Sequence, residues 1–208
     1  VIRLLIEGGM DVNLRALIAK AVDSQPKSKA DKGALVDEIA SFVGDRLRRY
    51  FLDRDTGLAT ETFEAVMLRQ PESLLDFDRR LAAVQTFARM EQAQSLAAAN
   101  KRTANILRQA GDPEGLKINR KLLSDEAEQA LLNALENARD KVGPMLQQRQ
   151  YAEALSTLAD LRDPVDRFFD DVMVMADDEA VKNNRLALLG ELRALFLDVA
   201  DISRLSLG

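Results

Sequence analysis

The sequence predicts an all-α fold, a compact bundle of about nine mostly antiparallel helices. Only five prolines and ten glycines interrupt 208 residues rich in Ala, Leu, Arg, Glu and Asp, a composition that favours helices. Apolar residues recur at intervals of three and four along most of the chain. No segment alternates apolar and polar residues between turn signals, so we expect no strand.

The first helices are separated by polar breaks. Val1–Glu7 has the pattern of a short amphipathic helix, and Asp11 or Asn13 is expected to cap the next one. A polar linker, residues 27–32, follows that helix. In the longer helix after the linker, seven apolar residues recur at intervals of three and four: Leu35, Ile39, Phe42, Val43, Leu47, Tyr50 and Phe51.

Prolines and capping residues delimit the middle of the chain. Thr60 is expected to cap a helix, and Pro71 to end that helix and open the next in its first position. Residues 72–110 hold no proline or glycine, but a single helix of that length is unusual in a compact domain, so we expect a bend within 89–98. Gly111-Asp112-Pro113 ends this region.

Capping residues and prolines also delimit the predicted helices of the C-terminal part. Ser124 is predicted to cap a helix, and Gly143-Pro144 to break or bend it. Asp163-Pro164 is predicted to cap and start a further helix, and the last one should begin near Asp177 or Asp178. The expected helices therefore cover residues 1–7, 14–22, 35–51, 60–68, 72–110, 124–142, 151–161, 164–173 and 178–199. We expect residues 1–58 to form an N-terminal helical segment, truncated at its start, and residues 59–208 the main bundle.

The composition excludes several kinds of chemistry. The chain has no histidine and no cysteine, which excludes zinc fingers, Ser–His and Cys–His nucleophilic sites, thiol redox chemistry and disulfides. Carboxylate pairs such as Asp170-Asp171 fall near predicted helix ends, and no glycine-rich phosphate loop follows Gly8-Gly9. No apolar run approaches the roughly 18 residues that a membrane-spanning helix needs. We therefore expect no catalytic, metal-binding or cofactor-binding residues in this chain.

One basic helix face is the strongest polar feature. Residues 92–110 contain no acidic side chain, although the whole chain has 34 and a net charge of −5. Lys101, Asn105 and Arg108 fall at i, i+4 and i+7 on one face, with Arg102 on its flank. Such a face can contact a phosphate backbone, and an Asn beside it could read a base edge. The alternative is a solvated face whose cations pair with acids elsewhere in the bundle.

A second basic patch is weaker. Arg46 and Arg49 lie at i, i+3 beside Tyr50, whose ring could stack on a base or belong to the core. We keep these two arginines as further candidate RNA-binding residues. The acidic stretch 163–179 has the opposite character: it would repel RNA and suits solvent or a protein partner.

Longer strings resemble a known family. Residues 97–107 (AAANKRTANIL), 151–178 (YAEALSTLADLRDPVDRFFDDVMVMADD) and 184–205 (NRLALLGELRALFLDVADISRL) closely resemble the C-terminal region of the β subunit of bacterial glycyl-tRNA synthetase. The opening, residues 1–18, is similar to the segment that precedes it there. The Asp-Ala-Leu-Arg string that gives the family's domain its name does not occur in this sequence.

The resemblance implies a DALR-type anticodon-binding domain, a helical bundle that holds the anticodon stem-loop of tRNA-Gly. It implies that the domain supports ATP-dependent glycylation of tRNA-Gly without catalysing it. In the family the partner is the α subunit, in an α2β2 heterotetramer, and that subunit uses ATP and Mg²⁺. The string NKRTANIL carries an RNA-binding role over to Lys101, Arg102, Asn105 and Arg108.

Two functions from different classes follow. The first is a cytoplasmic tRNA-binding module of glycine–tRNA ligase, with no DNA or membrane partner and no cofactor of its own. The alternative is a helical protein-interaction scaffold that docks a partner subunit through its acidic C-terminal face.

Overall fold

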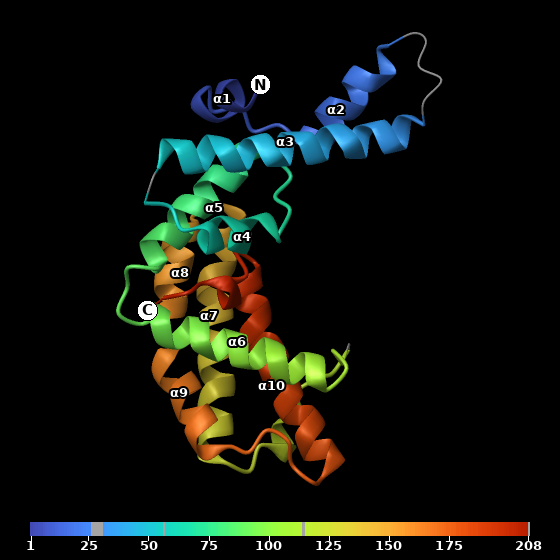
Figure 1. Cartoon of the computed structure of the whole chain (residues 1–208). Helices are drawn as coiled ribbons and strands as arrows, with labels where there is room; N and C mark the ends of the chain where they lie inside the picture. The colour runs from blue at the N-terminus through green and yellow to red at the C-terminus, as the bar shows by residue number, and fades with distance from the viewer. Residues whose placement is uncertain (26–30, 56, 114, 208) are drawn as a thin grey trace.

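The protein is all-α. A computed structural model describes residues 1–25, 31–55, 57–113 and 115–207, and in these ranges it contains ten α-helices, two 3₁₀ turns and no strand (Figure 1). The elements are α1 (Ile2–Glu7), α2 (Leu14–Asp23), α3 (Lys32–Arg54), α4 (Thr60–Met67), α5 (Leu74–Phe87), α6 (Ala93–Gln109), η1 (Arg120–Leu122), α7 (Glu126–Gln147), α8 (Tyr151–Ala159), α9 (Arg162–Asp171), α10 (Glu179–Leu197) and η2 (Ile202–Arg204). The predicted fold class is confirmed, with one more helix than the nine expected because the span 72–110 divides into two.

The long helix α3 lies across one end of the bundle and reaches beyond it, and α2 packs back along the projecting half (Figure 1). With this placement Phe42, one of the apolar residues that recur at three and four, is not packed in the core and is 57% exposed. The buried residues of α3 are Leu47 and Phe51, in the half that meets the bundle. Periodicity alone gives the face of a helix and not how far the helix outreaches its neighbours.

Asn13 caps α2, as one of the two predicted candidates, by accepting a hydrogen bond of 2.9 Å from the backbone N–H of Ala16. Most of the predicted linker, residues 27–32, lies outside the described residues. The division of the chain between residues 58 and 59 stays a prediction.

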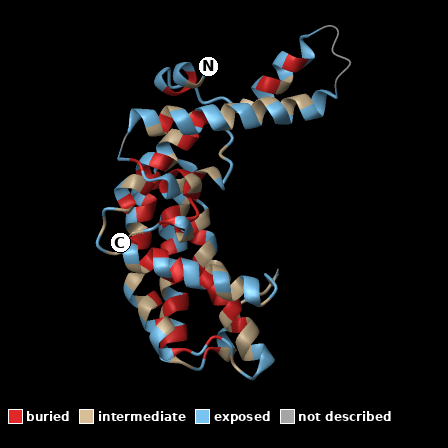
Figure 2. Cartoon of the chain, viewed as in Figure 1, coloured by how far each residue is buried: buried red, intermediate tan, exposed pale blue. Residues whose placement is uncertain are grey.

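Phenylalanines fill the core where the N-terminal helices meet the bundle. The rings of Phe51, Phe63 and Phe77 lie with centroids between 5.0 and 6.4 Å apart. Deeper in the bundle, Phe87 of α5 packs against Phe196 of α10 at 6.2 Å. Figure 2 shows the buried residues along the inner faces of these helices, whereas α2 and the projecting half of α3 are mostly exposed. Burial of these side chains supplies the main driving force for folding.

The predicted bend between α5 and α6 is confirmed as a break at residues 88–92. The backbone tightens there, because Arg89 N–H donates to Thr86 O (3.2 Å) and Met90 N–H donates to Phe87 O (2.9 Å). Proline and glycine are both missing from this break. Ala93 and Leu96, each fully buried, instead hold α6 in its new direction. The break lets α6 turn across α9 and α10.

Two predicted helix starts in the first half of the chain are wrong. Thr60 does not cap α4: it is the first helical residue, and the N-cap position is Ala59, which offers no side-chain acceptor. Pro71 does not open α5, and α4 already ends at Met67. Ser73 holds the capping position, and its Oγ accepts from the backbone N–H of Asp76 at 3.0 Å.

The predicted cap of α7 is also displaced by one residue. Asp125 rather than Ser124 is the N-cap, because its Oδ1 accepts from Ala127 N–H (2.8 Å) while Glu128 Oε2 accepts from Asp125 N–H (3.0 Å). This reciprocal arrangement is a capping box, which Ser124 could not form with an Ala three residues later. The predicted start of the last helix near Asp177 or Asp178 is confirmed: α10 begins at Glu179, and Asp178 is its N-cap.

Neither of the two later prolines starts or ends a helix. Gly143-Pro144 does not break α7, which continues to Gln147 because Val142 and its neighbours pack into the core. Asp163-Pro164 lies inside the first turn of α9, whose N-cap is Leu161. Proline is tolerated in that turn because the N–H that it lacks would have had no intrahelical partner.

The C-terminal segment is tied to the bundle by its backbone. Asp201 N–H donates to Ala65 O of α4 at 2.8 Å. Arg80 of α5 donates from Nη1 to Asp198 O (2.6 Å) and to Val199 O (2.8 Å). These bonds hold η2 against α6, so that the last residues run alongside that helix (Figure 1).

Candidate nucleic-acid interface

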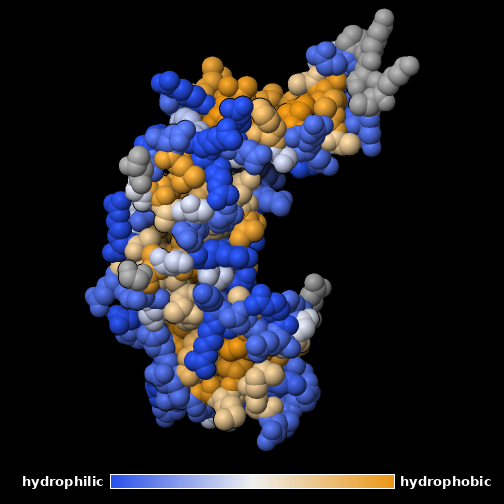
Figure 3. All heavy atoms as spheres, viewed as in Figure 1, coloured by the Kyte–Doolittle hydropathy of each residue, from blue (hydrophilic) through white to orange (hydrophobic). Residues whose placement is uncertain are grey.

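Helix α6 presents its basic face because its opposite face is buried. The buried residues share one side of the helix and are small or apolar with two polar exceptions: Ala93, Leu96, Ala97, Ala99, Asn100 and Thr103. Asn100 donates from Nδ2 to Leu96 O within the helix at 3.0 Å. The four predicted RNA-binding residues, Lys101, Arg102, Asn105 and Arg108, are all exposed. Figure 3 shows predominantly hydrophilic surface at this level of the molecule.

The structure brings three of these four residues together. Lys101, Asn105 and Arg108 line one groove. Arg102 lies on the other flank of α6, with its guanidinium carbon 4.4 Å from the ring centroid of Phe169 on α9. A planar guanidinium stacked in this way keeps its charge exposed while its position is fixed.

The cations of this face have no acidic partners in the part of the chain that the structure describes. No carboxylate lies within 4.0 Å of the charged groups of Lys101, Arg102 or Arg108 there. Arg108 instead donates from Nη2 to Oδ1 of Asn105, one turn away. The geometry therefore gives no support to the alternative in which these side chains are neutralised by acids elsewhere in the bundle.

The far wall of the groove comes from the end of the chain. Arg193 of α10 and Arg204 of η2 face α6, and Ser203 and Asp201 lie between them. The groove has a volume of about 320 Å³. The sequence did not predict these two arginines as site residues, because they lie about ninety residues or more from α6 and no local pattern marks them. The packing of α10 on α6 places Arg193 there, and the packing of η2 on α6 places Arg204 there.

Arg46 and Arg49 are exposed on α3, as expected, but they do not join the α6 face. Figure 1 shows α3 at one end of the molecule and α6 toward the other. The Arg46 guanidinium lies 5.1 Å from the ring centroid of Phe42. Tyr50 is half-buried, and its hydroxyl accepts from Arg54 Nη1 (3.2 Å) and donates to Glu7 Oε1 (3.5 Å), so its ring belongs to the junction of α1 and α3.

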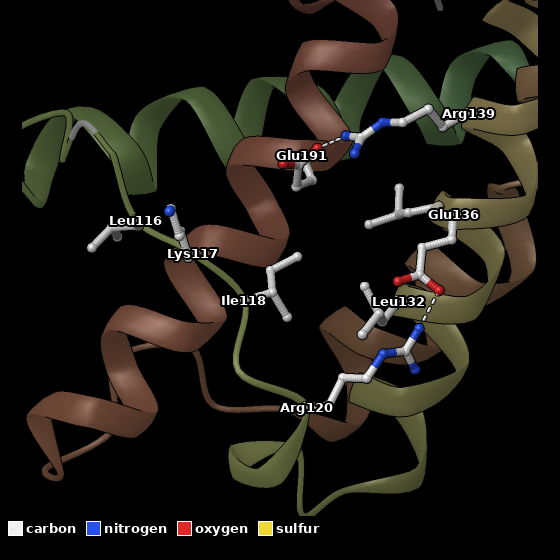
Figure 4. Close-up of a pocket in the computed structure, with 9 residues that line it drawn as sticks. Leu116, Lys117, Ile118, Arg120, Leu132, Glu136, Arg139 and Glu191 are labelled. Atoms are coloured by element: carbon white, nitrogen blue, oxygen red, sulfur yellow. Dashed lines mark hydrogen bonds and ion pairs between the residues drawn. The ribbon is translucent and has the colours of Figure 1, made fainter.

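A second groove, of about 220 Å³, lies between η1, α7 and α10 (Figure 4). Its two arginines are matched by acids: Arg120 pairs with Glu136, and Arg139 pairs with Glu191 (Figure 4). Lys117, which precedes η1, also lines this groove. Because both arginines are paired, its excess of positive charge is smaller than that of the α6 groove.

The acidic stretch 163–179 is partly engaged in local contacts. Asp166 accepts from Ser95 Oγ at 2.5 Å, and Asp171 lies 3.4 Å from Arg167 within α9. Asp178 caps α10 and Glu179 pairs with Lys182 at 2.6 Å. These contacts give the acids structural roles within the bundle.

The described residues contain neither a metal-binding cluster nor a membrane-spanning helix. No group of three or more acidic side chains there is arranged to hold a metal ion. None of the described helices combines the length and hydrophobicity that crossing a membrane requires.

The part of the chain that the structure describes is an all-α domain with an exposed cationic groove beside α6. The profile of the DALR anticodon binding domain matches residues 96–202, from α6 to the first residue of η2. The chain belongs to this family. The matched region contains the residues that line the groove from Lys101 to Asp201, and Ser203 and Arg204 lie just beyond it.

Curated proteins with similar sequences are named glycine–tRNA ligase beta subunit. This chain is 45% identical over 205 residues to that of Chromohalobacter salexigens, 45% over 206 residues to that of Marinobacter nauticus and 45% over 205 residues to that of Pseudomonas aeruginosa. Each alignment covers 99% of this chain, but only 29%, 29% and 30% of the respective relative. The chain thus spans under a third of the length of these relatives. The resemblance seen in the sequence is confirmed.

Proposed function

We propose that this chain is the tRNA-binding module of a glycine–tRNA ligase β subunit and that it holds the anticodon stem-loop of tRNA-Gly. The observation that carries the proposal is the exposed face of Lys101, Asn105 and Arg108, which has no carboxylate partner among the described residues and lies inside the matched anticodon-binding region. Cationic side chains that are not neutralised can replace the counterions of an RNA backbone.

In this proposal the chain binds tRNA-Gly and catalyses no step of its glycylation. Glycine activation with ATP and Mg²⁺ belongs to a catalytic α subunit, with which the whole ligase forms a heterotetramer. A cytoplasmic location goes with the proposal, because the tRNA substrate is there. The alternative, a scaffold that docks a partner subunit through residues 163–179, has less support, because several of those acids already pair locally.

The decisive experiment measures binding of tRNA-Gly at several salt concentrations. Reversing two charges on α6, with Lys101→Glu and Arg108→Glu, should weaken binding and lower the slope of log affinity against log salt by roughly one unit for each phosphate that is no longer bound. The matched control, Arg15→Glu with Lys20→Glu, makes the same change in net charge on α2, which lies at the far end of the molecule (Figure 1). It should have a smaller effect.

A second pair of variants tests the weaker patch. Arg46→Glu with Arg49→Glu should reduce binding only if α3 also contacts the tRNA. If the α6 variants and the α2 variants lose affinity equally, the effect is one of net charge and the α6 face is not the binding site. Unchanged affinity in the α6 variants would likewise reject the proposal.

A further inference from the structure

The groove between α6 and the C-terminal segment holds more positive charge than its own acids balance. Lys101 and Arg108 line one wall, and Arg193 and Arg204 line the other. The carboxylates that line it are those of Asp112 and Asp201. A groove that concentrates one sign of charge attracts the opposite sign most strongly at its centre.

Asp201 cannot neutralise both arginines of its wall. Its carboxylate is 10% exposed and lies 3.2 Å from Arg193 Nη2 and 4.0 Å from Arg204 Nε. Its Oδ1 also accepts from Ser203, at 3.3 Å from the backbone N–H and at 2.5 Å from Oγ. One negative charge is therefore shared between two guanidinium groups while it also caps η2.

Arg193 has an unsatisfied donor. Its Nη1 is buried, and no acceptor lies within hydrogen-bond distance among the residues that the structure describes. A buried donor without a partner is costly, so such atoms are uncommon in folded proteins and call for an explanation. Because Nη1 is shielded from solvent, a ligand in the groove meets the accessible part of the Arg193 side chain, which is 23% exposed and lines the groove. A phosphate oxygen is a strong acceptor for a guanidinium.

Asn105 adds a donor to the same groove. Because its Oδ1 already accepts from Arg108, the Nδ2 amide group is what remains to contact a ligand. The groove thus offers amide, ammonium and guanidinium donors, and the hydroxyl of Ser203 already donates to Asp201. This set suits a ligand made of acceptors, which describes a phosphate better than a base edge with mixed donors and acceptors.

We propose that this groove is a phosphate-binding subsite, in which a backbone phosphodiester of the bound RNA lies between α6 and η2 and accepts from Arg193, Arg204, Lys101 and Arg108. The proposal rests on the RNA-binding function proposed above, and it adds Arg193 and Arg204 as contact residues. It assigns the groove to backbone positioning and leaves base reading to side chains outside it.

The test uses Arg204→Gln and Arg193→Gln in the whole chain, with Arg120→Gln as the matched control. Arg204 is the safer variant for folding because its side chain is 59% exposed, and Arg120 is an arginine of the groove in Figure 4 that pairs with Glu136. Each groove variant should lower the slope of log tRNA affinity against log salt by roughly 0.7–0.9 and weaken binding several-fold at low salt. The control should bind as the unchanged chain does.

A second measurement uses inorganic phosphate alone. At constant ionic strength, phosphate in place of chloride should raise the thermal unfolding midpoint of the unchanged chain and of Arg120→Gln, and should raise that of Arg193→Gln less. Protection by phosphate together with unchanged tRNA slopes would mean a site for the free ion, and would overturn the RNA-backbone assignment.

The outcomes separate this proposal from the one it rests on. If Arg204→Gln and Arg193→Gln keep the full affinity and slope while the α6 charge reversals weaken binding, the subsite is wrong and the RNA-binding function stands. If the α6 reversals leave binding unchanged as well, both proposals fail.

Discussion

Tyr151 at the start of α8 donates a hydrogen bond of 2.6 Å from its hydroxyl to Oδ1 of Asp76 on α5. Arg80 completes the arrangement, with Nε 2.8 Å from Asp76 Oδ2 and Nη2 3.0 Å from Tyr151 Oη. The same guanidinium lies 4.3 Å from the centroid of the tyrosine ring. This buried polar cluster joins α5, α8 and, through Arg80, the C-terminal segment.

Tyr151→Phe should destabilise the fold by about 1–3 kcal/mol, because it leaves a nearly buried carboxylate without one of its donors. Urea unfolding followed by circular dichroism measures the change. Tyr50→Phe is the matched control: Tyr50 is half-buried and makes longer contacts, at 3.2 and 3.5 Å, so its loss should cost less. Equal costs for the two variants would contradict a special role for the Tyr151–Asp76 bond.

The stability of the chain should also depend on alkaline pH through Tyr151. Burial, and then the hydrogen bond to Asp76, raise the pKa of Tyr151 from 10.0 to about 12. The folded state therefore keeps a proton that the unfolded chain loses. The resulting stabilisation is fully present below pH 10 and disappears as the pH rises to about 12.

Titration of tyrosinate absorbance in a Tyr50→Phe background isolates Tyr151, because the chain has only two tyrosines. The midpoint should lie near 12 while the protein is folded. The stability gap between the unchanged chain and Tyr151→Phe should narrow over the same interval. A midpoint near 10 in the folded protein would show that the hydroxyl is not held as described.

Glu128 on α7 is fully buried and depends on Arg185 of α10. Its Oε1 accepts from Arg185 Nε at 2.5 Å, and its Oε2 accepts from the backbone N–H of Asp125. Arg185→Ala should cost about 3–5 kcal/mol, because it leaves a buried carboxylate unpaired. Arg185→Ala combined with Glu128→Gln should cost less than the sum of the two single changes, and a double-mutant cycle by chemical denaturation measures the difference. Simple additivity would mean that the pair contributes no coupling.

Gly143 lies within α7, and a Cβ built there meets no atom within 4 Å. Gly143→Ala should therefore stabilise the chain by about 0.5–1 kcal/mol, since alanine loses less backbone entropy in a helix. Gly111→Ala provides the contrast: space is equally open there, but the φ angle of +84° is unfavourable for an L side chain. Thermal unfolding should show a higher midpoint for the first variant and a lower one for the second.

Periodicity predicted the helices well because burial decides where they form. Apolar residues recur with helical spacing through residues 72–110 without interruption. A break was nevertheless expected there because a single helix of that length is unusual, and the structure places the break at residues 88–92. Helix ends were less predictable, since capping depends on a second residue. The capping box of Asp125 with Glu128 was present in the sequence as D-x-x-E, and this signal could have corrected the choice of Ser124.

The other differences between the prediction and the structure arise from tertiary packing, which the sequence pattern does not show. Pro144 is tolerated within α7 because the helix is held by buried neighbours such as Val142. Phe42 is exposed because α3 outreaches the bundle, a property of the assembled fold. The α6 face could be predicted because one helix carries it, whereas Arg193 and Arg204 could not, because only the return of the chain to α6 brings them close.

The backbone hydrogen bond from Asp201 to Ala65 has a consequence for synthesis on the ribosome. Helix α6 is translated long before the segment that faces it, so a nascent chain that has not yet released residues 193–204 displays only one wall of the groove. A partly made chain should therefore bind RNA more weakly than the complete chain, and full affinity should arise only after η2 packs against α6.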